Sequence, residues 1–451
     1  MKRLIIIVTT TCLLASCGIY KPYSRPDITT EGLYKGAQTT DTASLANLSW
    51  RELFTDKRLQ TLIEEGLVRN TDLRIARLRI EEAKAVLMNA RLSYLPAVSL
   101  NPEAAISNYD GATTKTYNLT ASTSWEIDVF GKITNAKRGA RAVLESSRSY
   151  EQAVQTQLVA TIADSYYTLL MLDRQLAIHE RTLDTWERTV KTLEALKQAG
   201  KSNDAAVLQA RANRMTLEAS VLSTRKNINQ TENSLSALLA MSSRTIDRGT
   251  LGAQQFPDTL SIGVPVQLLS NRPDVKQSEQ ALAQAFYATN ATRSAFYPRI
   301  TLSGTAGWTN NGGGAILNPG SWLLNAISSL VQPLFNRGTN IANLKIAKAQ
   351  QEEALLAFQQ AILDAGKEVN DALIQWQTAS QRIGISTRQI AALQEAVHKT
   401  ELLMRHSTNN YLEVLTAQQS LLSAELTQAQ DQFEEIQGII RLYHALGGGI
   451  L

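Results

Sequence analysis

The sequence predicts a mainly α-helical chain with long antiparallel helices, four short β-strands and an internal two-fold repeat. Three observations favour this fold class. Helical periodicity runs through long stretches without proline. Four segments of about ten residues are strand candidates, three of them with clear alternation of apolar and polar positions, and the two halves match at four ordered places. The chain has 451 residues, of which 44% are hydrophobic, enough to bury a core without disulfide bonds.

The first residues have the features of a secretory signal peptide. Lys2 and Arg3 precede an apolar run of about 13 residues, which is shorter than the roughly 20 that a spanning helix needs. The stretch "LASC" (14–17) then resembles a bacterial lipobox, whose cysteine is acylated after cleavage. We therefore predict a signal peptide at 1–16 and lipidation of Cys17; an ordinary signal peptide with a chance cysteine is the alternative.

Cysteine content argues against disulfide bonds in the mature chain, and net charge argues against a nucleic-acid partner. The other cysteine, Cys12, lies inside the predicted signal peptide, so the mature chain would contain no disulfide. Loss of Lys2 and Arg3 leaves 43 basic residues of 45 against 41 acidic ones, a net charge of +2. This balance argues against a nucleic-acid partner.

The two halves of the chain match in the same order. The paired positions are Asp72 with Asp274 and Pro96 with Pro298 (202 apart), Phe130 with Phe335 (205 apart), and 203–211 with 410–418 (207 apart). Because the offset drifts by so little, we predict a duplicated unit, with repeats at 57–247 and 268–446.

Each repeat is expected to contain one full-length and one interrupted helical run. Between 133 and 199 there is no proline and a single glycine, which allows one helix of about 100 Å at 1.5 Å per residue. The stretch 340–404 is similar. The stretches 57–92 and 205–240 predict helices of about half that length, so that two stacked end to end would match one long helix.

Four strands are expected, two in each repeat. Their predicted ranges are about 97–108, 116–129, 299–309 and 321–332, and the polar tips 108–115 and 310–320 would join them as hairpins. The first three alternate clearly, whereas the fourth is more apolar and alternates poorly. Each has the length of a tilted transmembrane strand.

Two features favour a membrane wall over a small soluble sandwich with one wet face. The polar faces carry Glu and Asp among hydroxyls, and Trp125, Trp308 and Trp322 lie near strand ends, as in the aromatic girdle of a membrane β-barrel. Four strands cannot close a barrel, since the smallest closed barrels have about eight. The barrel must therefore be shared; two copies would give eight strands and three would give twelve, and the residues alone leave both open.

Several stretches together resemble the TolC family, and more narrowly its lipid-anchored branch, the outer-membrane factors of RND-type efflux systems. They are the lipobox, "RPDV" (272–275), "AFYPRITLSG" (295–304), "PLFNRG" (333–338) and "YLEVLTAQQSLLSAE" (411–425). The resemblance runs from about Trp50 to the C-terminus. It implies a homotrimer with a shared twelve-stranded β-barrel in the outer membrane and a trimeric α-barrel tunnel in the periplasm. It also implies a small mixed equatorial domain, made from 17–56, 248–267 and the tail 447–451.

The function implied by this resemblance is a passive exit duct. A periplasmic adaptor protein and an inner-membrane RND transporter would be the partners, together with outer-membrane lipid. The alternatives are the outer-membrane component of an ABC-type exporter or type I secretion system, and a lipid-anchored structural coiled coil that never enters the membrane.

The resemblance also places the periplasmic mouth at the turns 199–210 and 407–418. Family members often carry two acidic residues three apart in the second turn; here Glu413 has the first position and Thr416 the second, so one acidic ring is expected. The residues implied to contact the adaptor are Gly200, Asn203, Asp204, Asn410 and Tyr411. The alternative for Glu413 is a solvated first-turn acid favoured by its helix dipole.

No motif predicts catalysis. The four histidines form no metal-binding pair with an acid at helical spacing, and the glycine runs 312–314 and 447–449 lack the lysine and helix of a phosphate loop. We therefore expect neither an enzyme nor a cofactor or metal site.

Overall fold

The computed structural model describes residues 20, 22–28, 32–33, 45–256, 271–309, 321–406 and 411–449. They belong to two compact units. The first contains 1–28, 77–149 and 276–361, and the second contains 29–76, 150–275 and 362–451. None of the described helices combines the length and the apolar composition that a membrane-spanning helix needs.

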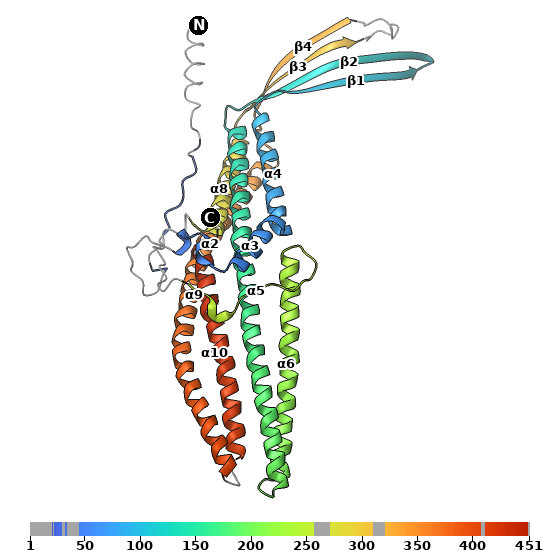
Figure 1. Cartoon of the computed structure of the whole chain (residues 1–451). Helices are drawn as coiled ribbons and strands as arrows, with labels where there is room; N and C mark the ends of the chain where they lie inside the picture. The colour runs from blue at the N-terminus through green and yellow to red at the C-terminus, as the bar shows by residue number, and fades with distance from the viewer. Residues whose placement is uncertain are drawn as a thin grey trace. The chain divides into compact units, whose positions relative to one another are not determined.

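Long helices dominate the described chain (Figure 1). They are α2 (Trp50–Leu53), α3 (Lys57–Arg69), α4 (Thr71–Leu92), α5 (Lys132–Gln198), α6 (Asp204–Leu238), α8 (Pro273–Ser294), α9 (Thr339–His406) and α10 (Tyr411–Ala445), with short 3-10 turns η1 (Leu45–Asn47) and η2 (Leu251–Ala253). α5 and α9 have 67 and 68 residues, about 100 Å each at 1.5 Å per residue. Both agree with the predicted 133–199 and 340–404.

The prediction of one helix over 57–92 is wrong, because Asn70 separates α3 from α4. Asn70 has ψ 130°, outside the helical region, and its Oδ1 accepts from the Leu73 amide at 2.9 Å. Its Nδ2 donates to the carbonyl oxygen of Leu238 at 2.9 Å. The side chain therefore caps α4 and at the same time satisfies the end of α6.

The first unit contains a four-stranded antiparallel sheet in the order β1-β2-β3-β4. The strands are β1 (Ala97–Tyr109), β2 (Ala112–Ile127), β3 (Arg299–Thr309) and β4 (Ser321–Val331). β2 ends two residues before the predicted 129, because the Asp128 carboxylate accepts from the amides of Ile133 and Thr134 and caps α5.

The predicted tip 108–115 is too long. The turn consists only of Asp110 and Gly111, with φ of 50° and 78°. Asp-Gly favours a two-residue hairpin turn in which both residues have positive φ, so β1 and β2 extend almost to each other. The second predicted tip, 310–320, lies outside the described residues.

The helices of the first unit pack through small and aliphatic side chains. Ala83 and Leu87 of α4 meet Ala140 and Leu144 of α5 in a buried cluster. The segment 22–28 lies along α8, where Arg25 donates to both oxygens of Glu279 at 2.8 and 2.7 Å. This N-terminal segment is thus part of the fold of the first unit.

The core of the second unit joins α5, α6, α9 and α10. Its buried members are Ile178, Trp186, Val190, Leu193, Ala206, Val207, Ala210, Leu217, Met404, Val414, Leu415, Leu422 and Ala429. Among them lies the buried amide of Gln418, which donates to Thr189 at 3.2 Å and to Glu401 at 3.1 Å. Buried polar groups need such partners, so this amide favours one alignment of the three helices.

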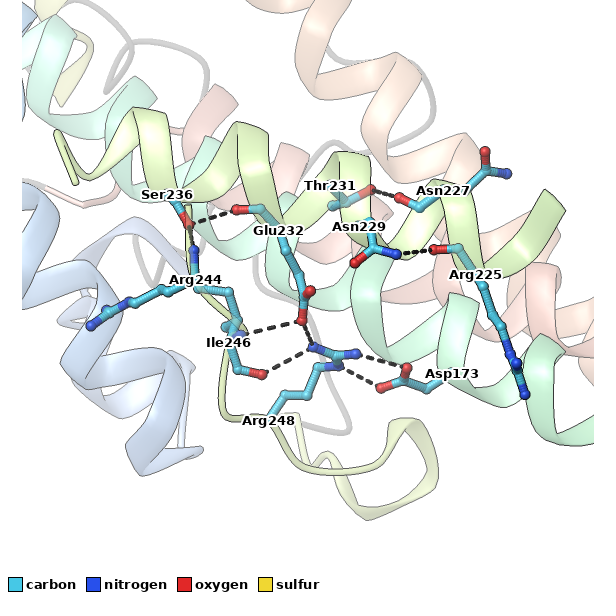
Figure 2. A network of polar contacts seen from close by, with 10 residues as sticks. All are labelled: Asp173, Arg225, Asn227, Asn229, Thr231, Glu232, Ser236, Arg244, Ile246 and Arg248. Atoms are coloured by element: carbon cyan, nitrogen blue, oxygen red, sulfur yellow. Dashed lines mark hydrogen bonds and ion pairs between the residues drawn. The ribbon is translucent and has the colours of Figure 1, made fainter. Parts of the chain in front are cut away.

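An arginine holds the segment after α6 in place (Figure 2). Arg248 forms ion pairs with Asp173 of α5 and Glu232 of α6, and Glu232 also accepts from the Ile246 amide at 3.2 Å. The hydrogen bonds to Asp173 raise the pKa of Arg248 most, and Glu232 adds to them. The start of the predicted equatorial linker is thus fixed on two helices.

A buried arginine, Arg272, lies next to the C-terminal glycines. Arg272 is 4% exposed, contacts Asp274 through two hydrogen bonds and donates to Glu368 at 2.6 Å and to the Ala445 carbonyl at 3.1 Å. A Cβ on Gly448 would lie 2.3 Å from the Tyr443 ring. Gly447 and Gly449 have φ of 90° and 93°, which favour glycine, so each of the three positions has a local reason for this residue.

Candidate functional site

The strand register places most of the large apolar side chains of the four strands on one face of the sheet. Residues directly opposite in antiparallel strands share a face. Two neighbouring rows on this face are Leu100, Ala121, Ala306 and Leu324, and Pro102, Leu119, Trp308 and Trp322. In one chain these side chains are open to the surroundings; Leu324 is 81% exposed and Val98 73%. Such a contiguous apolar face is typical of a surface that meets lipid or another protein.

The opposite face is lined by hydroxyl and amide groups that bind one another. The Oγ atoms of Ser99 and Ser122 lie 2.8 Å apart, Asn101 donates to Ser122 at 2.7 Å, and Thr309 donates to Asn118 at 2.6 Å. The alternation predicted for the first three strands is therefore real and coherent across the sheet.

β4 departs from this pattern, as its sequence indicated. Trp322, Leu324 and Leu330 lie on the apolar face, but Leu323 and Ile327 lie on the polar face together with Asn325. The polar face thus has an apolar strip along one edge strand.

The three tryptophans mark opposite ends of the sheet. Trp308 and Trp322 are cross-strand neighbours with ring centroids 4.8 Å apart. Trp125 lies six residues along β2 from Leu119, the partner of Trp308, or about 20 Å at 3.3 Å per residue. Its Nε1 donates to the Tyr94 carbonyl at 2.8 Å. That these tryptophans belong to aromatic girdles at the two membrane interfaces remains a prediction.

Both outer strands of the sheet are long. Within the described residues, β1 pairs only with β2 and β4 only with β3, so each has one edge with no strand beside it. Unpaired edges of this length are templates for pairing with another chain.

The turn between α5 and α6 contains three of the predicted adaptor-contact residues. Gly200 has φ 74° and its amide donates to the Lys197 carbonyl at 3.0 Å, so it ends α5. Asn203 caps α6 by accepting from the Ala206 amide at 2.8 Å. Asp204 pairs with Lys197, and the hydrogen bond and charge of this lysine lower the pKa of Asp204.

The first turns of α10 present the predicted gate residues outward. Glu413 and Thr416 are exposed, while Val414 and Leu415 between them are buried in the core. Tyr411 packs against that core, whereas Asn410 lies outside the described residues, as does Cys17.

A groove of about 400 Å³ runs between the starts of α6 and α10. Gln209 and Thr416, which the proposed repeat makes equivalent, both line it. Among the described residues, no group of three or more His, Cys, Asp or Glu side chains could hold a metal ion. The geometry offers surfaces and a groove rather than a reaction centre.

Some contacts that hold the helices together could not be found from the sequence. Arg248 carried no local signal, because its partner Asp173 lies 75 residues away. Gln418 stood in the quoted stretch 411–425, but its contact with Thr189, 229 residues away, did not follow from that motif. Arg272 stood in the quoted "RPDV" stretch, but its contact with Glu368 did not follow from that motif.

The family model described as outer membrane efflux protein matches residues 62–241 and 264–448. The chain belongs to this family. Among similar curated proteins, the cation efflux system protein CusC of Escherichia coli K12 is 31% identical, with 97% of both chains covered. The probable outer membrane lipoprotein SilC of Salmonella typhimurium is 30% identical, with 99% of both covered. The toluene efflux pump outer membrane protein TtgC of Pseudomonas putida is 28% identical, covering 99% of this chain and 96% of TtgC.

Solved structures of efflux channels have the same fold. The outer-membrane channel OprN superposes with a TM-score of 0.87 at 27% identity, covering 96% of this chain and all of OprN. The open state of the Neisseria gonorrhoeae MtrE outer membrane channel also gives 0.87 at 27% identity, covering 96% of this chain and 99% of MtrE. The predicted family, outer-membrane location and exit-duct function are thereby confirmed, and the family is one of channels rather than of enzymes.

Proposed function

We propose that three copies of this chain close their sheets into one twelve-stranded barrel through the outer membrane, continued by an α-helical tunnel in the periplasm. The main support is the strand register, which gathers most of the large apolar side chains of the four strands on one face of the sheet. Within the described residues, each of the two outer strands also has an unpaired edge. In lipid every backbone group must find a partner, so an open sheet has to close. Rotational symmetry joins the β4 edge of one copy to the β1 edge of the next.

The same proposal assigns the parts of the chain. Residues 1–16 are the signal peptide, Cys17 carries the lipid anchor, and 17–56, 248–267 and 447–451 form the equatorial domain. The repeats are 57–247 and 268–446, a division supported by the two separate matches at 62–241 and 264–448. Trp125 lies at one membrane interface, and Trp308 and Trp322 lie at the other.

The duct is passive in this scheme. An inner-membrane RND-type transporter selects the cargo and supplies the energy, and a periplasmic adaptor joins it to the tips around Gly200, Asn203, Asp204, Asn410 and Tyr411. Similar proteins carry names that refer to cations and to toluene, which fits cargo selection outside the duct.

Glu413 is proposed to form one carboxylate ring at the periplasmic mouth. It is exposed on the first turn of α10, and Thr416 lies three residues further on the same side. Three carboxylates brought together attract cations and repel one another.

Planar lipid bilayers test both proposals. Purified protein is expected to give stable single-channel currents, because the polar sheet face would line a water-filled path. Glu413→Ala should weaken block by divalent cations, while Thr416→Ala, which removes no charge, should leave that block unchanged.

Absence of currents from correctly folded protein would favour the lipid-anchored structural rod. Currents with the same divalent block in Glu413→Ala would leave the duct in place and remove the gate assignment.

A further inference from the structure

The polar face of the sheet carries few charges, and they lie in the rows near the two ends of β3. The charged side chains on this face of the described strands are Glu103, Glu126 and Arg299. Between the end levels the face presents only neutral groups on the described strands, among them Ser122, Thr305 and Asn325. Charge on this face is therefore confined to a few rows.

Glu126 is neutralised locally. Lys132 Nζ lies 2.9 and 3.1 Å from its two carboxylate oxygens. This pair contributes little net charge to the face.

Arg299, the first residue of β3, differs from Glu126 in this respect. It lines a cavity of about 230 Å³ together with Glu126, Asp128 and Lys132. The Asp128 carboxylate accepts from the amides of Ile133 and Thr134 and from the Thr134 hydroxyl. None of the ion pairs within the described ranges includes Arg299, and its side chain is exposed.

Glu103 lies in the row at the other end of β3, midway along β1, whose hairpin with β2 continues six residues further, to Tyr109. It stands in one cross-strand row with Asn118, Thr309 and Ser321, and it accepts a hydrogen bond from the neutral side chain of Asn118 at 3.4 Å. Thr309 is ten residues along β3 from Arg299, so the two charges are separated by about 33 Å along the strand. For strands tilted as in membrane barrels, this is about 25 Å along the barrel axis, close to the height of the membrane.

We infer that Arg299 and Glu103 set the charge selectivity of the barrel, with a positive level at the helical end of the sheet and a negative level towards the first hairpin. The inference rests on the proposed function, because three copies must close the wall for each residue to form a ring. Small anions are favoured at the Arg299 level and small cations at the Glu103 level, independently of Glu413. Arg299 and Glu103 are thus specificity-determining residues for whatever passes through the wall.

Reversal potentials in planar bilayers under a KCl gradient test this inference with the full-length protein. At about 0.1 M salt, where the Debye length is about 10 Å, we expect Arg299→Gln to raise the cation-to-anion permeability ratio about twofold and Glu103→Gln to lower it about twofold. Both effects should vanish near 1 M salt, where the Debye length is about 3 Å.

Two control variants separate charge from shape. Arg299→Lys retains the charge and should keep the wild-type ratio. Thr301→Gln changes the size of a neutral side chain on the same face and should also keep it. A single-channel conductance near that of the wild type shows that each variant has assembled.

The inference is overturned if both charge removals leave the ratio unchanged, if they shift it in the same direction, or if the shifts persist near 1 M salt. Failure of the wild type to conduct would overturn the proposed function instead, so the two failures are distinguishable.

Discussion

His444 is half-buried among charged groups of the second unit. It lines a cavity of about 450 Å³ with Asp164, Glu368, Asp371 and Arg441. Burial lowers the pKa of His444 most and the charge of Arg272 lowers it further, while Glu368 and Asp274 act in the opposite direction. The imidazole is therefore neutral in the folded protein under conditions where it would begin to bind a proton in an unfolded chain.

This shift predicts a loss of stability in weak acid. Because the folded-state pKa lies below the ordinary 6.5, the unfolded chain binds the proton first, and stability falls as the pH drops below that value. His444→Gln should remove this component, so the difference in Tm between about pH 7.5 and pH 5.5 should be smaller in the variant. Equal pH dependence in both proteins would contradict the shift.

At the residue scale, the sequence could predict exposure better than partners. The alternative interpretation of Glu413 was a solvated acid in the first turn of a helix, and Glu413 is exposed at that place, as is Thr416. The contact of Arg272 with Glu368 could not be predicted, because it joins residues 96 positions apart. Such pairs depend on how helices pack, which no local pattern encodes.

Elements followed local patterns closely where the signal was periodic. α5, α9 and the strand β3 lie within one or two residues of their predicted ranges. The break at Asn70 was missed: its cap on the Leu73 amide is local, but its second partner, the carbonyl of Leu238, lies 168 residues away. The tight Asp110–Gly111 turn was a readable local signal that the longer polar tip obscured.

Asn70 offers a prediction at this scale. Asn70→Ala removes the cap of α4 and leaves the Leu238 carbonyl without its donor, which should cost about 2–3 kcal/mol in the free energy of unfolding. Asn70→Ser keeps a capping oxygen and should lose about half as much. Hydrogen exchange at the Leu73 amide measures the difference directly. Equal protection in Asn70→Ala and the wild type would remove the capping role.

At the scale of the whole molecule, the sequence predicted that the four strands of one chain cannot close a barrel. The structure adds the order and register of these strands. Four described strands in one order leave an unpaired edge on each outer strand. The number of copies could not be predicted from the residues, because eight and twelve strands both satisfy closure. The pattern of residues in one chain does not encode the curvature that distinguishes them.

Two adjacent residues of β4 test the assignment of faces. Ala326 shares the apolar face with Gly304, whereas Asn325 shares the polar face with Thr305. Ala326→Arg should oppose membrane insertion by about 2–4 kcal/mol per chain, as arginine does on the lipid face at the bilayer midplane. Asn325→Arg should insert normally. The measurement is the fraction of each variant that stays in lipid vesicles when they are washed with carbonate. Equal fractions for the two variants would contradict the assignment of faces.

The apolar residues of β4 on the polar face have a consequence for the molecules that pass through the proposed duct. Leu323, Ile327 and Val331 recur every fourth residue on the polar face, and each is more than a third exposed. Each subunit would thus contribute one apolar strip to the wall of the water-filled pore, beside its hydroxyl-lined surface. Small ions would gain nothing from this strip, whereas amphipathic molecules would place their apolar parts against it and out of contact with water.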